Sequence, residues 1–226
     1  MDPQARFTRN EGYPWVAVDL VIFTADERGL RCLLVQVKEG PFVGKWAFPG
    51  GLVGARESLD EAAAGELRER TGVHSGYLEQ LYTFGRPERD PANRVVSVSY
   101  MALVPFHRVT LSPGKKYRAV RWVDANLLPP LAYDHTQVAR LALQRLRAKL
   151  QYTNIVCHLL PKEFTLGELQ RVYEIIMARA LDRRNFRKKI LALKLLNPLH
   201  KQKIGPHRPA SLYSFKQRRA MVIEIL

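Results

Sequence analysis

The sequence predicts an α/β (α+β) chain of two domains, with a mixed β-sheet flanked by helices over residues 1–147 and a winged helix-turn-helix over residues 148–226. Three observations support this prediction. In the first domain, strand-like apolar runs alternate with helical patterns, as in a sheet covered by helices. In the second, closely spaced helices precede two short strands. The second domain is also basic, because residues 149–226 carry 16 Lys and Arg against 5 Asp and Glu, whereas residues 1–148 carry 20 against 16.

Composition and cysteine content limit the possible classes of protein. The chain of 226 residues is 46% hydrophobic, which is typical of a folded globular protein. Its two cysteines, Cys32 and Cys157, both lie in apolar segments, so we expect buried free thiols, as in a reducing cytoplasm. There is no secretory apolar region at the N-terminus and no run of 18 apolar residues, so we expect a cytoplasmic protein that does not contact a membrane.

Five runs rich in Val, Ile, Leu and aromatic residues predict the strands of the first domain. They are residues 15–24, 31–38, 77–85, 94–105 and 117–125. Two helices complete this domain. One is expected from Ser58 to Arg70, and the other begins near His135 and carries apolar residues at helical spacing up to Leu150.

The stretch from Gly50 to Val73, GGLVGARESLDEAAAGELRERTGV, places a glycine-rich turn before the first helix. Its spacing resembles the Nudix box, G-x5-E-x7-R-E-U-x-E-E-x-G-U, in which U is a bulky apolar residue. The matching residues are Gly51, Glu57, Glu66, Leu67, Glu69, Gly72 and Val73. The resemblance implies a Nudix-like sheet with a pocket for a nucleotide diphosphate. The alternative, that the glutamates are merely solvated helix charges, does not account for the full spacing.

Two positions of the box depart from the pattern. Nudix chemistry uses carboxylates on one helix face to hold a divalent metal against a pyrophosphate. Gly65 replaces the arginine that orients the glutamates, and Arg70 replaces the last glutamate with a cation. We therefore predict no catalytic residues, no metal site and no required cofactor, and interpret the domain as a sensor. An active nucleoside-diphosphate pyrophosphatase remains the alternative.

The second domain has the sequence pattern of a DNA-binding domain. A capping box at Thr165–Glu168 opens one helix, Asp182 opens the next, and segments 195–199 and 211–215 form a hairpin. The predicted DNA contacts are Thr165, Arg183, Arg184, Asn185, Arg187, Lys188, Lys201, Lys203 and Arg208. Thr165 would meet a phosphate at a helix N-terminus, and the last three would lie in the wing. A solvated basic face is the simpler alternative for the run RRNFRKK taken alone.

A degenerate Nudix domain followed by a winged helix resembles the NrtR family, the Nudix-related transcriptional regulators of NAD metabolism. Besides the box, the resemblance rests on segments 83–100, 131–135, 164–174, 181–191 and 208–215. It implies a homodimeric repressor that binds a palindromic double-stranded DNA operator and releases it on binding ADP-ribose or a related nucleotide. The ligand residues it implies are Gly50, Gly51, Glu66, Glu69, Arg86 and Asp90. A regulator that responds to a sugar is a second alternative.

Overall fold

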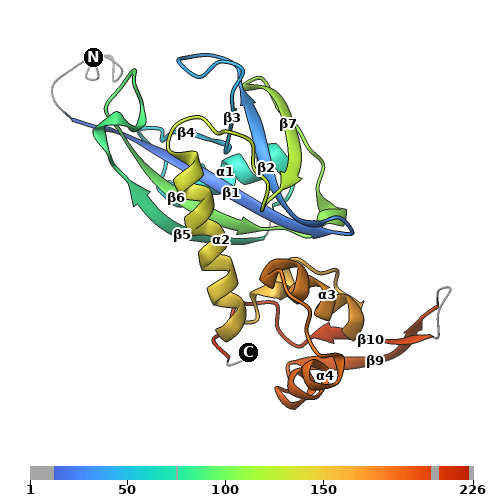
Figure 1. Cartoon of the computed structure of the whole chain (residues 1–226). Coiled ribbons are helices and arrows are strands. Elements are labelled where there is room, and N and C mark those ends of the chain that lie inside the picture. The colour runs from blue at the N-terminus through green and yellow to red at the C-terminus, as the bar shows by residue number, and fades with distance from the viewer. Residues whose placement is uncertain (1–12, 75, 205–208, 224–226) are drawn as a thin grey trace.

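The computed structural model describes residues 13–74, 76–204 and 209–223 (Figure 1). Its main sheet has the order β3-β2-β1-β6-β5, with β4 paired to β1 and β7 paired to β2. The strands are β1 (Trp15–Asp26), β2 (Gly29–Val37), β3 (Trp46–Ala47), β4 (Gly50–Leu52), β5 (Tyr77–Phe84), β6 (Val95–Leu103) and β7 (Tyr117–Asp124). β1 and β6 run parallel and the other pairs are antiparallel, so the predicted mixed sheet is confirmed.

Alternate residues of β1 point to opposite faces of the sheet, which gives each face its own helix. Leu20 and Ile22 pack in one apolar cluster with Leu67 of α1 (Leu59–Thr71). Val21 and Phe23 pack in another cluster with α2 (His135–Tyr152), which crosses the near side of the sheet in Figure 1. Because β1 is buried on both faces, its sequence reads as a continuous apolar run rather than an alternating one.

The second domain is a three-stranded sheet packed on helices, with strand order β8-β10-β9. Its elements are the 3-10 helix η4 (Ile155–His158), β8 (Phe164–Thr165), α3 (Leu166–Met177), α4 (Arg183–Ala192), β9 (Leu196–Lys203) and β10 (Ala210–Phe215). β9 and β10 project beyond the helices as a ribbon, as a wing should (Figure 1). The predicted winged helix-turn-helix is thus confirmed, although β9, the first strand of the hairpin, is longer than the expected segment 195–199 and begins one residue later.

Phe164 has a structural role that the sequence pattern did not predict. It stands directly before the capping box, lies in β8 and pairs with Tyr213 of β10. Its ring is fully buried and lies 5.1 Å from that of Phe215, centroid to centroid. A strand of two residues is too short to leave a period in the sequence, so only the pairing reveals it.

The two domains share α2 and one apolar cluster. α2 continues across the predicted boundary at 147/148 without interruption, and Leu146 and Leu150 lie in the same cluster as Leu169 of α3. The chain after the wing returns to the end of this helix, where Asn154 is buried and its side chain donates to the carbonyl of Arg219 at 3.1 Å. Within the described residues, no helix is long and apolar enough to cross a membrane.

Candidate functional site

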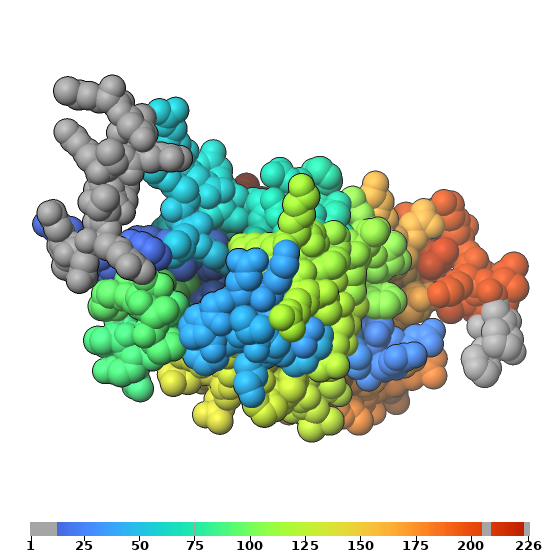
Figure 2. All heavy atoms as spheres, turned by 90° about the horizontal axis from the view of Figure 1, so that it is seen from above, coloured from blue at the N-terminus to red at the C-terminus, as the bar shows by residue number. Residues whose placement is uncertain are grey.

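A cavity of about 570 Å³ opens at the end of the main sheet where β4, β7 and α2 begin. This volume lies within the range of about 300–1,000 Å³ that small-molecule sites occupy. Its polar and aromatic lining comes from loops as well as strands and includes Asp19, Lys38, Phe48, Gly50, Gly51, Arg89, Asp90, Lys115, Lys116, Tyr117, Tyr133 and His135. The loop that follows β2 and the loop that precedes β7 lie together on the face shown in Figure 2. Lys38 of the first donates to the carbonyl of Lys115 of the second at 3.1 Å.

The box helix α1 presents Glu66 to the wall of this cavity. The helix starts where Ser58 and Glu61 form a complete capping box, and it ends at Gly72 in the left-handed conformation. Glu66 is 8% exposed, and both its carboxylate oxygens have donors. Lys116 Nζ lies 3.2 Å from Oε2, and the Tyr117 hydroxyl lies 2.9 Å from Oε1.

Arg70 is buried beside Glu66 with only 2% of its surface exposed. Its Nε lies 3.2 Å from Glu66 Oε1, and its terminal nitrogens donate to Glu69 and to the carbonyls of Ser112 and Pro113. Burial and the adjacent Glu66 carboxylate raise the pKa of Tyr117 well above its usual range, so its hydroxyl stays protonated at neutral pH.

These residues do not fit a divalent metal ion. A metal on this helix would need free carboxylate oxygens, but those of Glu66 already face Arg70, Lys116 and Tyr117. Glu69 is 62% exposed at its side chain and pairs with Arg70, and Glu57 accepts a bond from Gly54 N at 3.1 Å. Over the described part of the chain, no group of three or more His, Cys, Asp and Glu is placed to hold a metal.

The opposite wall is a buried ion network centred on Arg89. Its guanidinium lies 2.8 Å from Asp19 and 2.9 Å from Asp134, and it is 7% exposed as a residue. Ser97 donates to Asp19 at 2.6 Å. Burial alone would raise the pKa of Asp19, but His135, Arg89 and Ser97 together hold it well below its usual range.

His135 joins this network to the first turn of α2. Its Nδ1 accepts the backbone N–H of Phe48 at 2.9 Å, so the ring proton of the neutral form is on Nε2, which lies 3.3 Å from Asp19 Oδ1. Asp134 and His135 are the residues at which α2 begins. The start of the helix shared by the two domains is therefore part of the cavity wall.

The cavity brings together some of the predicted ligand residues and leaves others outside. Gly50, Gly51 and Asp90 line it, and Glu66 stands directly behind Lys116 and Tyr117. Glu69 and Arg86 are exposed and do not line it.

Arg89 lies in the position for which Arg86 was expected. It is three residues further along the same charged loop and is the arginine that reaches the cavity. The sequence signal, a charged RPERD loop, was present, but it cannot show which arginine is buried.

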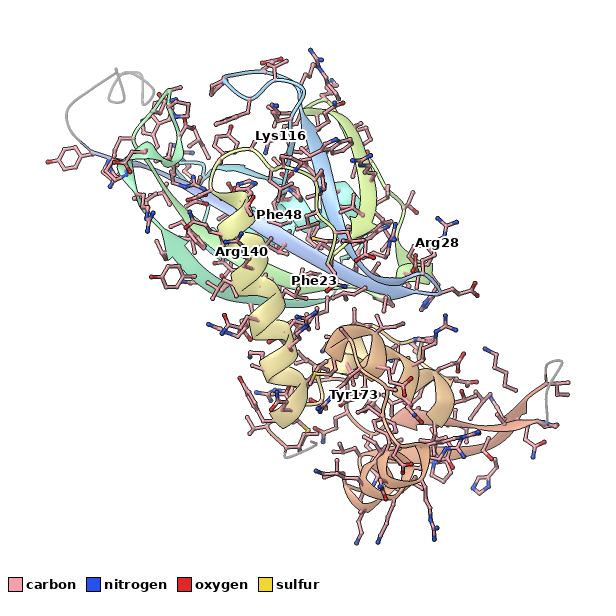
Figure 3. All side chains as sticks on the ribbon, in the orientation of Figure 1. Phe23, Arg28, Phe48, Lys116, Arg140 and Tyr173 are labelled. Carbon is pink, nitrogen blue, oxygen red and sulfur yellow. The ribbon has the colours of Figure 1, made fainter. Side chains whose placement is uncertain are left out.

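Sequence reasoning also missed Lys115, Lys116 and Tyr117 at the start of β7 and His135 at the start of α2. No motif singles out Lys116, which reaches the site only because β7 pairs with β2 beside the box. Figure 3 labels Lys116 above Phe48 at this end of the sheet.

The second candidate surface is α4 with the wing. Phe186 and Ile190 are buried against the domain, while the predicted contacts Arg183, Arg184, Asn185 and Lys188 are exposed. Arg187 is only half-buried, with an Nε that has no partner among the described residues. α4 thus presents a mostly basic outer face.

The remaining predicted contacts differ in accessibility. Lys201 and Lys203 are exposed and pair with Glu163 at 3.0 Å and Glu168 at 2.6 Å. Thr165 is buried; its N–H donates to the Glu168 carboxylate and its hydroxyl oxygen accepts the N–H of Glu168 in the capping box, so its N–H is not free for a phosphate. Arg208 lies outside the described residues.

Comparisons with known proteins match both domains. A model of the NUDIX domain matches residues 14–146, and a model of the NrtR DNA-binding winged helix domain matches residues 156–215. The chain belongs to the NrtR family. The resemblance found in the sequence is thereby confirmed, including the order of the two domains.

Relatives of known name extend the match over most of the chain. The "ADPR responsive transcriptional repressor NtrR" of Acinetobacter baylyi is 36% identical over 206 residues, covering 89% of this chain and 82% of that protein. Shewanella oneidensis NrtR, crystallised with a 27mer DNA, is 34% identical with a TM-score of 0.80, covering 89% and 93% of the two chains. The NUDIX domain of that NrtR, crystallised with ADP ribose, is 35% identical with a TM-score of 0.54, covering 65% and 94%.

Proposed function

We propose that this NrtR-family protein is a transcriptional repressor of NAD metabolism genes that releases its DNA operator when the NUDIX domain binds ADP-ribose or a related nucleotide. One observation carries the proposal: the helix that begins in the nucleotide-sized cavity ends against the DNA-binding domain. The names of the relatives, a repressor responsive to ADPR and structures with DNA and with ADP ribose, support the same ligands.

The cavity suits a nucleotide chemically. Phe48 and Tyr133 offer aromatic surface, and Lys115, Lys116 and Arg89 offer cations for phosphate oxygens. The paired glycines line the cavity, and a Cβ at Gly50 would lie 2.2 Å from the carbonyl oxygen of Val18, so this glycine lets β4 pack closely on β1. Gly50, Gly51 and Asp90 remain our proposed ligand contacts, and Glu66 is proposed to act through Lys116 and Tyr117.

The coupling proceeds through α2. Arg89 holds Asp134 at the start of the helix, and Arg147 near its end donates to the carbonyl of Ile176 in α3 at 2.9 Å. A ligand that draws Arg89 or Asp19 into new contacts alters the balance of forces on Asp134 and shifts α2. Because α2 packs on α3, the shift changes the placement of the winged helix and favours the state that does not bind DNA.

On the DNA side, we propose that α4 enters the major groove and the wing contacts phosphates. Arg183, Arg184, Asn185 and Lys188 would meet the groove, with Lys201 and Lys203 on the backbone. A homodimer would present two such helices to a palindromic operator with half-sites one or two helical turns apart. Such a regulator acts where the chromosome is, in the cytoplasm.

The same geometry argues against efficient hydrolysis of the bound nucleotide. Nudix hydrolysis depends on a metal that polarises the pyrophosphate, and both carboxylate oxygens of Glu66 already face Arg70, Lys116 or Tyr117. No neighbouring atom requires a glycine at position 65, because a Cβ there would meet nothing within 4 Å. We therefore propose a binding domain without appreciable pyrophosphatase activity and without a required cofactor.

A gel-shift titration tests the proposal directly. The protein is bound to DNA from its own upstream region, and ADP-ribose is added, with ribose 5-phosphate and AMP as matched ligands. Release by ADP-ribose alone is the expected result, and DNA should weaken ADP-ribose binding by the same factor. Unchanged DNA binding at saturating ADP-ribose would refute the effector assignment, and release by ribose 5-phosphate would favour a sugar-responsive regulator. Rapid production of AMP from ADP-ribose with Mg²⁺ would instead indicate an enzyme.

A further inference from the structure

We propose that the diphosphate of the effector is bound without any divalent metal, by Lys116, whose ammonium takes the place of the metal beside Glu66. The inference rests on the proposed function, because it names the group that holds the phosphates of the same ligand. It follows from the position of Lys116, from the charge balance around Glu66, and from the loop contacts of Arg70.

Lys116 stands between the box and the cavity. Its Nζ lies 3.2 Å from Glu66 Oε2, and its side chain is 45% exposed, so the ammonium retains N–H groups that face the open side. It also lies directly over Gly51, where an added Cβ would come within 2.5 Å of Nζ. The box glycine thus leaves space for a built-in cation at this point.

The charges around Glu66 are balanced before a ligand arrives. The formal charges of Glu66 and Glu69 are offset by those of Arg70 and Lys116, which pair with them. A Nudix box with a third glutamate at position 70 would instead present uncompensated carboxylates, and a diphosphate could approach only after a metal had neutralised them. Here Arg70 satisfies Glu66 from the buried side, which leaves the exposed ammonium of Lys116 for an anion.

Arg70 also positions the loop that carries Lys116. Its guanidinium donates to the carbonyls of Ser112 and Pro113, four and three residues before the lysine. Gly114 packs against the same group, since a Cβ there would lie 2.8 Å from Arg70 Nη1, and its φ of +56° favours glycine. The substitution that removes the metal ligand therefore also fixes its replacement in place. Arg70 is a positioning residue, and Lys116 is the proposed contact.

Calorimetric titration of the full-length protein with ADP-ribose separates the two kinds of site. We expect the same Kd, within about twofold, in EDTA and in MgCl2, since no step of binding needs a metal. Lys116→Gln is expected to weaken binding by roughly 10- to 100-fold, the loss of a charge-assisted hydrogen bond, and Lys116→Arg to restore most of it. Lys45→Gln is the matched control, because it removes the same charge from an exposed residue outside the cavity and should leave Kd unchanged.

The outcomes distinguish this inference from the proposed function. Binding that appears only with Mg²⁺, or a Lys116→Gln variant that binds as tightly as the wild type, would overturn the metal-free site while leaving the effector assignment intact. A wild-type protein that binds no ADP-ribose with or without Mg²⁺ would overturn both. A loss of equal size in Lys45→Gln would show that net charge, and not the position of Lys116, determines affinity.

Discussion

Arg70→Glu, which restores the last glutamate of the box, should destabilise the fold rather than restore hydrolysis. Arg70 is 2% exposed and pairs with Glu66, and it also donates to two backbone carbonyls. A carboxylate there would face the oxygens of Ser112, Pro113 and Glu66 with no donor among them. Breaking a buried ion pair costs about 3–5 kcal/mol, a large share of the roughly 5–15 kcal/mol that stabilises a typical domain.

Tryptophan fluorescence reports this change selectively, because Trp15, Trp46 and Trp122, the three tryptophans of the chain, all lie in the NUDIX domain. For a chain of this size the expected loss corresponds to a fall in Tm of about 6–20 °C. Arg68→Glu, an exposed charge reversal two residues away on the same helix, should cost less than about 1 kcal/mol. The reasoning fails if Arg70→Glu unfolds within about 2 °C of the wild type.

Three further predictions concern the helix, the domain junction and the DNA surface. Gly65→Ala should raise the free energy of unfolding by about 1 kcal/mol, because the position is helical and a Cβ has open space. Gly72→Ala, at φ +69°, should lower the free energy of unfolding by about as much, and urea denaturation measures both changes. Burial, aided by Arg218, lowers the pKa of His158 to about 4, so its folded pKa lies below its unfolded value near 6.5. The contribution of His158 to the free energy of unfolding should therefore be fully present above about pH 6.5 and should decrease as the pH falls towards 4. His158→Gln should flatten this part of a plot of Tm against pH. Arg184→Ala should weaken operator binding by roughly 1–3 kcal/mol if the side chain reads a base, and an equal loss on unrelated DNA in a filter-binding assay would instead mark a phosphate contact.

The helices and strands were predictable because their signals are local. Ser58, Thr165 and Asp182 were identifiable as helix starts, and the structure confirms each as an N-cap whose side chain accepts a backbone N–H. The apolar stripe of α2 and the strand-like runs depend on the same short-range periodicity. β8 was not predicted, because a strand of two residues is too short to show an alternating pattern of apolar and polar residues.

The site was less predictable, because its members come from distant parts of the chain. Gly50, Gly51 and Asp90 belong to recognisable segments, and the cavity includes them. Lys116 belongs to no motif, and the RPERD loop does not show that Arg89 is its buried arginine; these two residues contact Glu66 and Asp19, which are 50 and 70 residues away in sequence. Thr165, in contrast, was correctly placed at a helix start but is buried there, since burial depends on β10 packing beside it.

By itself the sequence determined the order of the two domains and the basic character of the second, since these follow from periodicity and composition, and its motifs carried the family resemblance. It also located the two departures from the box, Gly65 and Arg70. Only the tertiary structure decided what Arg70 does. The ion pair of Arg70 with Glu66 joins residues four apart on one helix, but pairing of β7 with β2 brings Lys116 and the carbonyls of the preceding loop onto it, and these contacts bury Arg70 and fix its partners. Such contacts arise from the packing of separate elements, and no local pattern encodes them.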